Sequence, residues 1–432
     1  MNSMNVVKKL VSVVVVAGFL AVGTFMLFSN RNDVTSKQVN TPSNQFDDLP
    51  LGVSKIFELP KYHEDFVISP DLESVAYILR EGNSYCVYLN SVRQKCYGYV
   101  QGLRFSPKNE LWYIAETIRD SHQQFLVGNG AEGKVYANIT PPIFNQTGSA
   151  WVSVATTYSG SLKQKKNYLI KNGDETALPY NSVSSLRISQ KGDVAALIGD
   201  FSALVINGKV RATHDIIFIF ALSPDGERFA YAAQDKSENG SRTSRWSAFL
   251  DGNRIGGPYG EIGEFIFSHN SDKLAYTALS IEKRKWVVIV NEKEIGQYDL
   301  VTGSVSIASS EAPMSFSPDD SKFLYFATND KTKGERYLFI NGEQSSEPLA
   351  SGFKIVFSPN NKHAVYIAES LPSRRSGDLN DSPQRKFFFV LDGKKSKEYE
   401  YFSAVQFSSD SKKIIYAFED KGNIMRVVEP VE

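Results

Sequence analysis

Hydrophobic and polar positions follow one short pattern that recurs along most of the chain. In its clearest copy, residues 222–233 (LSPDGERFAYAA), an apolar run ends in a Ser-Pro-Asp-Gly turn and a second apolar run follows at once. Pro, Asp and Gly each favour the backbone angles of tight turns, and short apolar runs bounded by such residues are typical of β-strands. The pattern therefore predicts two antiparallel strands joined by a tight turn.

Each copy continues in the same way. A polar loop of variable length leads to a third apolar run, which ends at Asn-Gly or Asp-Gly, as at residues 207–208 and 251–252. These dipeptides favour the type I′ turn of a two-residue hairpin. A fourth run follows and often carries a tyrosine, so each copy predicts a four-stranded antiparallel meander. Nine copies recur about every 42 residues, beginning at Ile68, Phe105, Phe144, Ile188, Leu222, Phe267, Phe316, Phe357 and Phe407.

Four strands repeated at this period predict an all-β fold, a β-propeller of four-stranded antiparallel blades. A lone meander leaves its faces exposed, whereas a closed ring buries each face against a neighbour. The copies that begin at Phe144 and Ile188 are the most degenerate, so eight or nine blades remain open; nine is favoured because every copy keeps its third strand. The last copy lacks a fourth strand, and residues 53–59, before the first copy, are expected to supply it.

An uncharged apolar run near the N-terminus follows two lysines. About 19 apolar residues can cross a bilayer as a helix, and the preceding lysines place the N-terminus in the cytoplasm. A cleaved signal peptide, with small residues at 21–23, is the alternative. Either way the rest is exported, to the periplasm or the cell exterior. The expected organisation is a short cytoplasmic segment (1–9), a transmembrane signal anchor (10–28), a flexible linker (29–52) and the propeller domain (53–432).

Charge and cysteine content narrow the functional classes. Lys plus Arg number 48 and Asp plus Glu number 48, so the net charge gives no general attraction to nucleic acid. Cys86 and Cys96 flank a predicted hairpin. They form a disulfide if both side chains share a face, and otherwise stay two buried thiols. Two cysteines without nearby histidines make a poor zinc site. We therefore expect no metal and no cofactor.

The loops between the second and third strands vary in length, and several are basic. Such loops all emerge on one face of a propeller, and variable loops on a rigid scaffold commonly carry recognition. Acidic residues in the same loops offset part of the charge, so an ordinary solvated surface is the alternative. The candidate partner-binding residues are Lys163, Lys165, Lys166, Arg242, Arg245, Lys283, Arg284, Lys285, Lys331, Lys333, Arg336, Arg374, Arg375, Arg385 and Lys386.

The Ser-Pro-Asp-Gly turn followed by an aromatic strand, in residues 222–233 and 316–327, resembles the WD40-like (PD40) repeats of TolB-type β-propellers. It also looks like the propeller domains of prolyl-oligopeptidase-type peptidases. The resemblance covers about residues 60–420 and implies the fold. No TolB-like N-terminal domain, hydrolase domain or Gly-x-Ser-x-Gly elbow is recognised. The resemblance therefore implies no peptidase activity, and it supplies no catalytic or binding residue.

Together these features predict a membrane-anchored propeller outside the cytoplasm that acts as a protein-interaction or ligand-binding scaffold in the cell envelope. The expected partner is an envelope protein or a cell-wall glycan, and no nucleic acid. The alternative is a glycan-active hydrolase or lyase, because a propeller can bring acids and bases from different blades to its central channel. No catalytic motif supports that enzyme, so the non-enzymatic function is the primary expectation.

Overall fold

The computed structural model describes residues 49–159, 164–234, 245–302, 314–333, 335–370, 386–399 and 401–431. All regular elements in these ranges are β-strands. A helix long and apolar enough to cross a bilayer does not occur among them. The expected anchor, residues 10–28, lies outside the described residues. The prediction of an all-β fold is confirmed for the described residues.

The strands group into four-stranded antiparallel units, called blades 1 to 9 here. Blade 1 contains β2 (His63–Ile68), β3 (Val75–Glu81), β4 (Ser84–Leu89) and β5 (Val92–Tyr97). Blade 2 contains β6 (Tyr99–Phe105), β7 (Leu111–Glu116), β8 (Gln124–Gly128) and β9 (Ala131–Glu132). Blade 3 contains β10 (Asn138–Ile139), β11 (Ile143–Phe144), β12 (Trp151–Ser159), β13 (Gln164–Lys171) and β14 (Asp174–Leu178). Blade 4 contains β15 (Val183–Ile188), β16 (Val194–Ile198), β17 (Ala203–Ile206) and β18 (Lys209–Thr213).

Blade 5 contains β19 (Ile216–Leu222), β20 (Phe229–Gln234), β21 (Trp246–Leu250) and the first part of β22 (Asn253–Phe267). Blade 6 contains the rest of β22 with β23 (Leu274–Ser280), β24 (Lys285–Val290) and β25 (Lys293–Tyr298). Blade 7 contains β26 (Leu300–Val301), β27 (Met314–Phe316), β28 (Phe323–Thr328), β29 (Tyr337–Ile340) and β30 (Glu343–Gln344). Blade 8 contains β31 (Ser351–Phe357), β32 (Ala364–Glu369), β33 (Phe387–Leu391) and β34 (Lys394–Lys395). Blade 9 contains β35 (Tyr401–Phe407), β36 (Lys413–Asp420), β37 (Asn423–Pro430) and β1 (Gly52–Glu58).

The described strands hydrogen-bond into eight sheets, because blades 5 and 6 share β22. Its first part pairs with β21 and its second part with β23, and the two parts meet at Tyr259. The seven-stranded sheet therefore holds two repeat units, and the nine copies correspond to nine units. Blade 3 has a divided first strand, since β10 and β11 both pair with β12. Blade 7 has the same division, because β26 and β27 both pair with β28.

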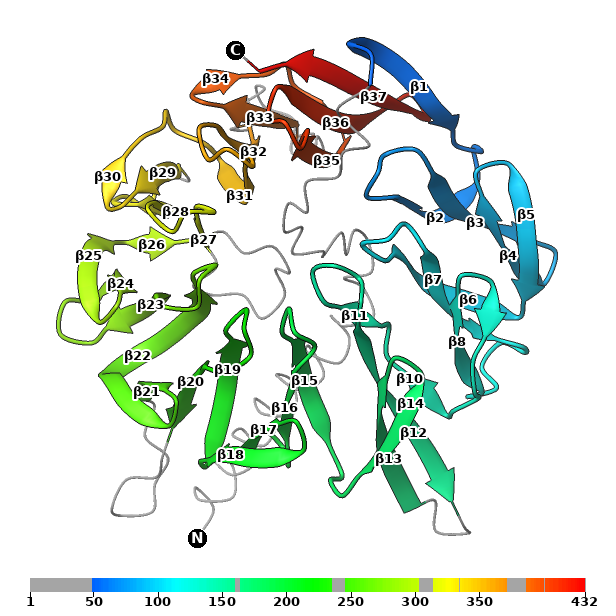
Figure 1. Ribbon diagram of the computed structural model, residues 1–432, viewed down its shortest axis with the longest axis horizontal. Coiled ribbons are helices and arrows are strands. Elements are labelled where there is room, and N and C mark those ends of the chain that lie inside the picture. The colour runs from blue at the N-terminus through cyan, green and yellow to red at the C-terminus, as the bar shows by residue number, and fades with distance from the viewer. Residues whose placement is uncertain are drawn as a thin grey trace, which may run out of the picture.

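The sheets stand around a common centre, with the first strand of each blade innermost, which gives a propeller-like ring (Figure 1). The ring is closed by β1, which pairs antiparallel with β37 from Gly52↔Val428 to Glu58↔Asn423. The prediction that residues 53–59 complete the last blade is thus confirmed. Just before β1, Leu49 packs against the blade 9 core.

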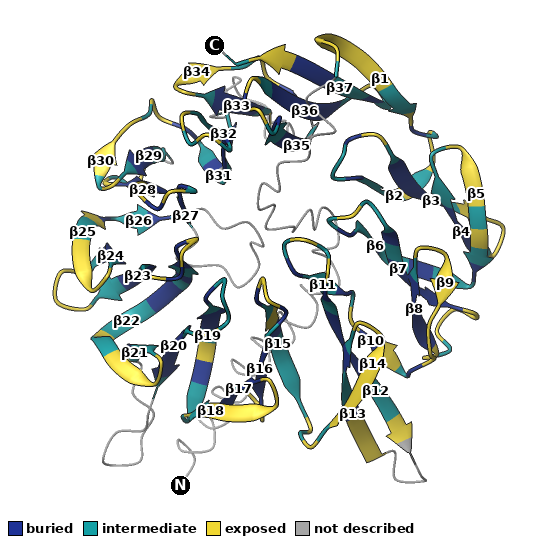
Figure 2. Ribbon diagram, in the orientation of Figure 1, coloured by how far each residue is buried: buried dark blue, intermediate teal, exposed yellow. Residues whose placement is uncertain are grey.

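The hydrophobic core lies between neighbouring blades. One cluster joins Ala76, Ile78 and Val87 of blade 1 to Leu111 and Tyr113 of blade 2, all buried. The second and third strands are mostly buried, whereas the fourth strands at the rim are largely exposed (Figure 2). Each blade therefore depends on its neighbours to cover its faces.

The Ser-Pro-Asp-Gly turns are structural. The buried Ser223 hydroxyl lies 2.5 Å from the Asp225 carboxylate, and its oxygen accepts the backbone amide of Arg228 at 2.9 Å. Gly226 has a φ of 75°, and a Cβ there would lie 2.0 Å from a carboxylate oxygen of Asp193 in blade 4. Glycine is therefore required both by the backbone and by the approach of the neighbouring blade.

The predicted type I′ turns between third and fourth strands are confirmed by left-handed pairs, as at Asn207 (φ 48°) and Gly208 (φ 76°). The structure adds a second reason for asparagine. The Asn207 side-chain oxygen accepts the backbone amide of Val194, the first residue of β16, at 2.9 Å. The turn residue thus fixes the start of the second strand as well as the hairpin.

The tyrosines of the fourth strands also have a structural partner. The hydroxyl of Tyr298 lies 2.7 Å from that of Tyr325, which is fully buried in the second strand of blade 7. Tyr399 donates to Tyr416 in the same way at 3.1 Å, between blades 8 and 9. Each pair satisfies a buried hydroxyl at a blade junction.

Candidate binding face

An antiparallel meander places its connections alternately on two faces of the ring. The turns from first to second strand and from third to fourth strand lie on one face, here called the turn face. The connections from second to third strand, and from one blade to the next, lie on the opposite face, the loop face. Neighbouring connections bond to one another there, as Gly98 donates its backbone amide to Thr117 O at 3.2 Å. The loop face therefore combines segments from adjacent blades.

The chain enters the ring on the turn face. The Lys413 ammonium donates to the backbone oxygen of Leu49 at 2.8 Å, directly after the first turn of blade 9. From there β1 runs towards the loop face, where the Leu59 amide bonds to Gly422 O at 2.7 Å. The segment that precedes residue 49 thus joins the domain on the side opposite the variable loops.

The structure places ten of the predicted basic residues and leaves five outside the described part. Lys165 and Lys166 belong to strand β13 rather than to a loop, because β12 and β13 stay paired up to Ser159↔Gln164. This corrects the expected loop boundary. The exposed ones are Lys165, Lys166, Arg245, Lys283, Arg284, Lys331, Lys333 and Lys386; Lys285 and Arg336 are half-buried. Those outside the described residues are Lys163, Arg242, Arg374, Arg375 and Arg385.

Part of this positive charge is paired within the domain. Lys283 contacts both carboxylate oxygens of Glu294, at 2.9 and 2.8 Å. Lys285 pairs with Asp299. Arg336 is held near the backbone of its own loop, and burial lowers its pKa. The loop face of blades 6 and 7 is therefore a mixed-charge surface rather than a uniformly basic patch.

The innermost strands carry a second group of functional candidates that the sequence pattern does not indicate. Arg187 of blade 4 lies over the ring of Phe220 in blade 5 (5.7 Å) and is attracted to Glu264 in blade 6. It keeps exposed surface although protein encloses it on most sides; burial lowers its pKa, and Glu264 opposes that shift. A register shift between Ile262 and Phe265 displaces Glu264 from the regular strand pattern.

This arrangement bears on the enzymatic alternative. Glycoside hydrolysis typically uses two carboxyl groups about 5 to 10 Å apart. Glu264 is instead attracted to the guanidinium of Arg187, and a guanidinium stays protonated at working pH. The attraction between Arg187 and Glu264 therefore gives no specific support to acid–base chemistry.

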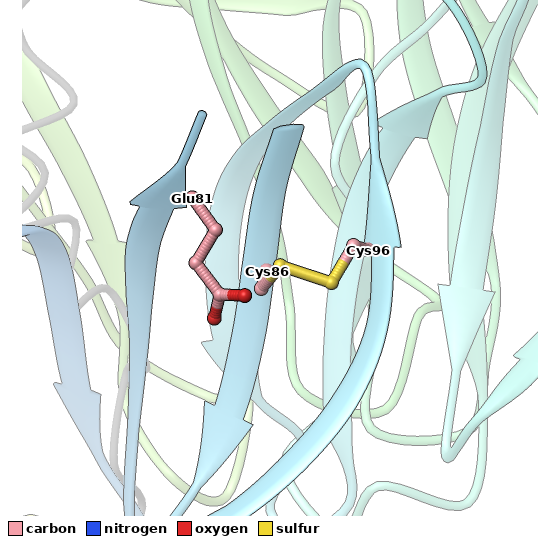
Figure 3. A group of neighbouring side chains, drawn as sticks. All are labelled: Glu81, Cys86 and Cys96. Atoms are coloured by element: carbon pink, nitrogen blue, oxygen red, sulfur yellow. A yellow bond between two sulfur atoms is a disulfide. The ribbon is translucent and has the colours of Figure 1, made fainter. Parts of the chain in front are cut away.

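Cys86 and Cys96 face each other across β4 and β5 and form a disulfide, with Cα atoms 4.1 Å apart. Glu81 lies beside them (Figure 3). Metal ligation by cysteine needs thiolates, which a disulfide does not offer. The Glu81 carboxylate is also bound by Arg93 (2.8 Å) and Tyr88 (2.6 Å). These hydrogen bonds, chiefly that from Arg93, lower the pKa of Glu81.

Two histidines in the turns are held by carboxylates rather than freely solvated. His363 Nδ1 lies 2.7 Å from Asp392 within blade 8. His269 Nδ1 lies 3.2 Å from the buried Asp320, which also accepts the backbone amides of His269 and Asn270 from blade 6. Both are structural links of the turn face.

Comparison with known proteins identifies no family. No family model and no curated protein matches the chain. Similar solved structures include a eukaryotic initiation factor, at 13% identity over 87% of this chain and 90% of that one, with a TM-score of 0.42. A putative dipeptidyl aminopeptidase IV from Bacteroides ovatus has 11% identity over 90% and 60%, with a TM-score of 0.41. An acylaminoacyl peptidase from Pyrococcus horikoshii has 10% identity over 68% and 52%, with a TM-score of 0.37. The strand pairing above, not these likenesses, defines the fold.

Proposed function

We propose that the chain is a WD40-like, PD40/TolB-type β-propeller that is anchored in a membrane and works outside the cytoplasm as a binding scaffold. Its loop face receives an envelope protein or a cell-wall glycan. The observation that carries this proposal is the entry of the chain on the turn face, at the Leu49–Lys413 contact. An anchor at residues 10–28 then attaches on the side away from the loops.

Two further features support the proposal. The linker between residue 28 and the first described residue spans 20 positions, and a chain of that length reaches at most about 70 Å. The ring can therefore stand clear of a bilayer. The Cys86–Cys96 disulfide suits an oxidising compartment.

Charge reversal on the two faces tests this function. In the full-length chain, the loop-face variant K165E/K166E/R284E is compared with the turn-face variant K209E/K293E/K362E. All six lysines and arginines are exposed. After chemical crosslinking in cells, the loop-face variant should lose the specific adduct, and the turn-face variant should retain it. Loss confined to the turn-face variant, or no adduct from the unmodified chain, contradicts the proposal.

A further inference from the structure

The connection between β7 and β8, residues 117–123, is fixed at its stem by buried polar groups. Gln124 donates its side-chain amide to the Glu116 carboxylate at 2.7 Å, and both residues are buried. The Gln124 side-chain oxygen accepts the backbone amide of Ile139 in blade 3 at 3.2 Å. Because buried polar groups hold their partners firmly, both ends of this loop are anchored to two blades.

The middle of the loop lies directly on the connection between blades 1 and 2. Gly98 donates its amide to Thr117 O, and a Cβ at Gly98 would lie 2.5 Å from the Arg119 nitrogen and 2.6 Å from the Ile118 Cα. Only a glycine permits so close an approach. The loop is therefore pressed onto the scaffold instead of extending into solvent.

Arg119 provides a third attachment. Its guanidinium lies 5.8 Å from the ring centre of Tyr85 and 5.7 Å from that of Tyr99, and Nη1 donates to the Tyr85 hydroxyl at 3.1 Å. The Arg119 side chain nevertheless keeps 55% of its surface exposed. Asp120 and His122 adopt left-handed backbone angles (φ 59° and 51°). Such angles cost free energy in residues other than glycine, so the surrounding contacts must impose them.

The result of these attachments is an exposed apolar side chain on a fixed stretch of backbone. Ile118 is 70% exposed, although the backbone on both sides of it is fixed. A backbone already fixed before binding loses little entropy when a partner covers it. Arginine and aromatic residues next to an apolar contact are typical of the groups that dominate protein interfaces.

We propose that loop 117–123 is the docking loop by which the loop face binds a partner protein. Ile118 fills an apolar pocket of the partner, and the edge of that pocket carries a carboxylate for Arg119. This rests on the proposed binding role of the loop face. A glycan offers hydroxyl-rich surfaces rather than a pocket for an isolated isoleucine. A bilayer is disfavoured because the chain enters on the opposite face, and stable membrane binding needs more apolar contact than one side chain supplies.

Photocrosslinking at single positions tests the docking role of loop 117–123. A benzophenone amino acid replaces Ile118 in the full-length chain in its own membrane. The matched control is Ile281, which is the same residue type on the same face, 43% exposed, in blade 6. Position 118 should give one discrete protein adduct and position 281 should not. When Arg119→Glu is added to the protein that carries benzophenone at position 118, the amount of adduct should fall about tenfold. This corresponds to the loss of one charge-assisted pair between Arg119 and the partner. Arg119→Lys should restore part of it, and Lys362→Glu, at an exposed residue of the turn face, should leave it unchanged.

The outcomes distinguish the docking role of loop 117–123 from the broader binding function of the loop face. An adduct at position 281 but not at 118 overturns the docking role of loop 117–123 and leaves the loop-face function standing. Adducts only with lipid, or only with a second copy of this chain, also overturn the docking role of loop 117–123. The absence of an adduct from both positions also overturns the docking role of loop 117–123. Unchanged thermal unfolding of each variant confirms that a lost adduct does not reflect misfolding.

Discussion

The Nδ1 atom of His363 lies 2.7 Å from a carboxylate oxygen of Asp392, at the edge of the turn face. The other oxygen of Asp392 accepts the backbone amide of Ala364 at 2.9 Å. Asp392 occupies the turn position where other blades carry asparagine. Asp251 repeats the arrangement, because its carboxylate pairs with Arg228 at 3.0 Å. An acidic turn residue therefore accompanies a cationic or imidazole side chain just before the second strand.

Substitution of Asp392 separates these two roles. Asp392→Asn keeps an oxygen for the Ala364 amide and loses only the pair with His363, so unfolding free energy should fall by less than about 1 kcal/mol. Asp392→Ala leaves the amide without its partner and should cost about 1 to 3 kcal/mol. Urea unfolding of both variants measures the difference. Equal losses would show that the amide contact contributes nothing.

The tight contact at Gly226 predicts a larger effect. Gly226→Ala introduces a Cβ into the Asp193 carboxylate as well as a left-handed alanine, and should destabilise the domain by about 2 kcal/mol or more. Gly252→Ala is the matched control, because Gly252 also has a positive φ (87°) but nothing within 4 Å of its Cβ. It should cost about 1 kcal/mol. If calorimetry gives equal shifts, the blade 4–blade 5 contact is not tight.

The junction between blades 9 and 1 depends on an apolar contact. Leu72 is fully buried against Ala404 and Ile415. Leu72→Ala should cost about 2 to 5 kcal/mol. Leu51→Ala, at a side chain 57% exposed, should change stability by less than about 0.5 kcal/mol. A small effect of Leu72→Ala in chemical unfolding would indicate that the junction between blades 9 and 1 does not depend on this contact.

The buried tyrosines predict a loss of stability in alkali. Burial raises the pKa of Tyr366 to about 12, and burial with the Tyr298 hydrogen bond raises that of Tyr325 further. An unfolded tyrosine titrates near pH 10. Because the folded pKa values are higher, the stabilisation is complete below about pH 10 and declines as pH rises towards the folded values. Tyrosinate absorbance of folded and urea-unfolded protein measures this. A single titration near pH 10 in the folded protein would contradict it.

Much of the fold could be predicted from sequence because the repeats carry their own turn chemistry. The turn at Gly226 and the hairpin at Asn207 are local, so their residues specify their conformation directly. The conformation of loop 117–123 could not be predicted. Its shape depends on Gly98 and on Tyr85, which belong to a neighbouring connection and an adjacent blade. The same holds for Lys283, whose charge is paired with Glu294 only once the hairpin forms.

The most direct test of the central claim compares the two faces of the ring. Benzophenone amino acids are placed singly at Tyr62, Ile118 and Ile281 on the loop face and at Val92, Lys209 and Lys362 on the turn face, all exposed. The full-length chain is irradiated in its own membrane. The account predicts that discrete non-lipid adducts arise from the loop face alone. Adducts that arise from the turn face alone, or equally from both faces, would contradict it.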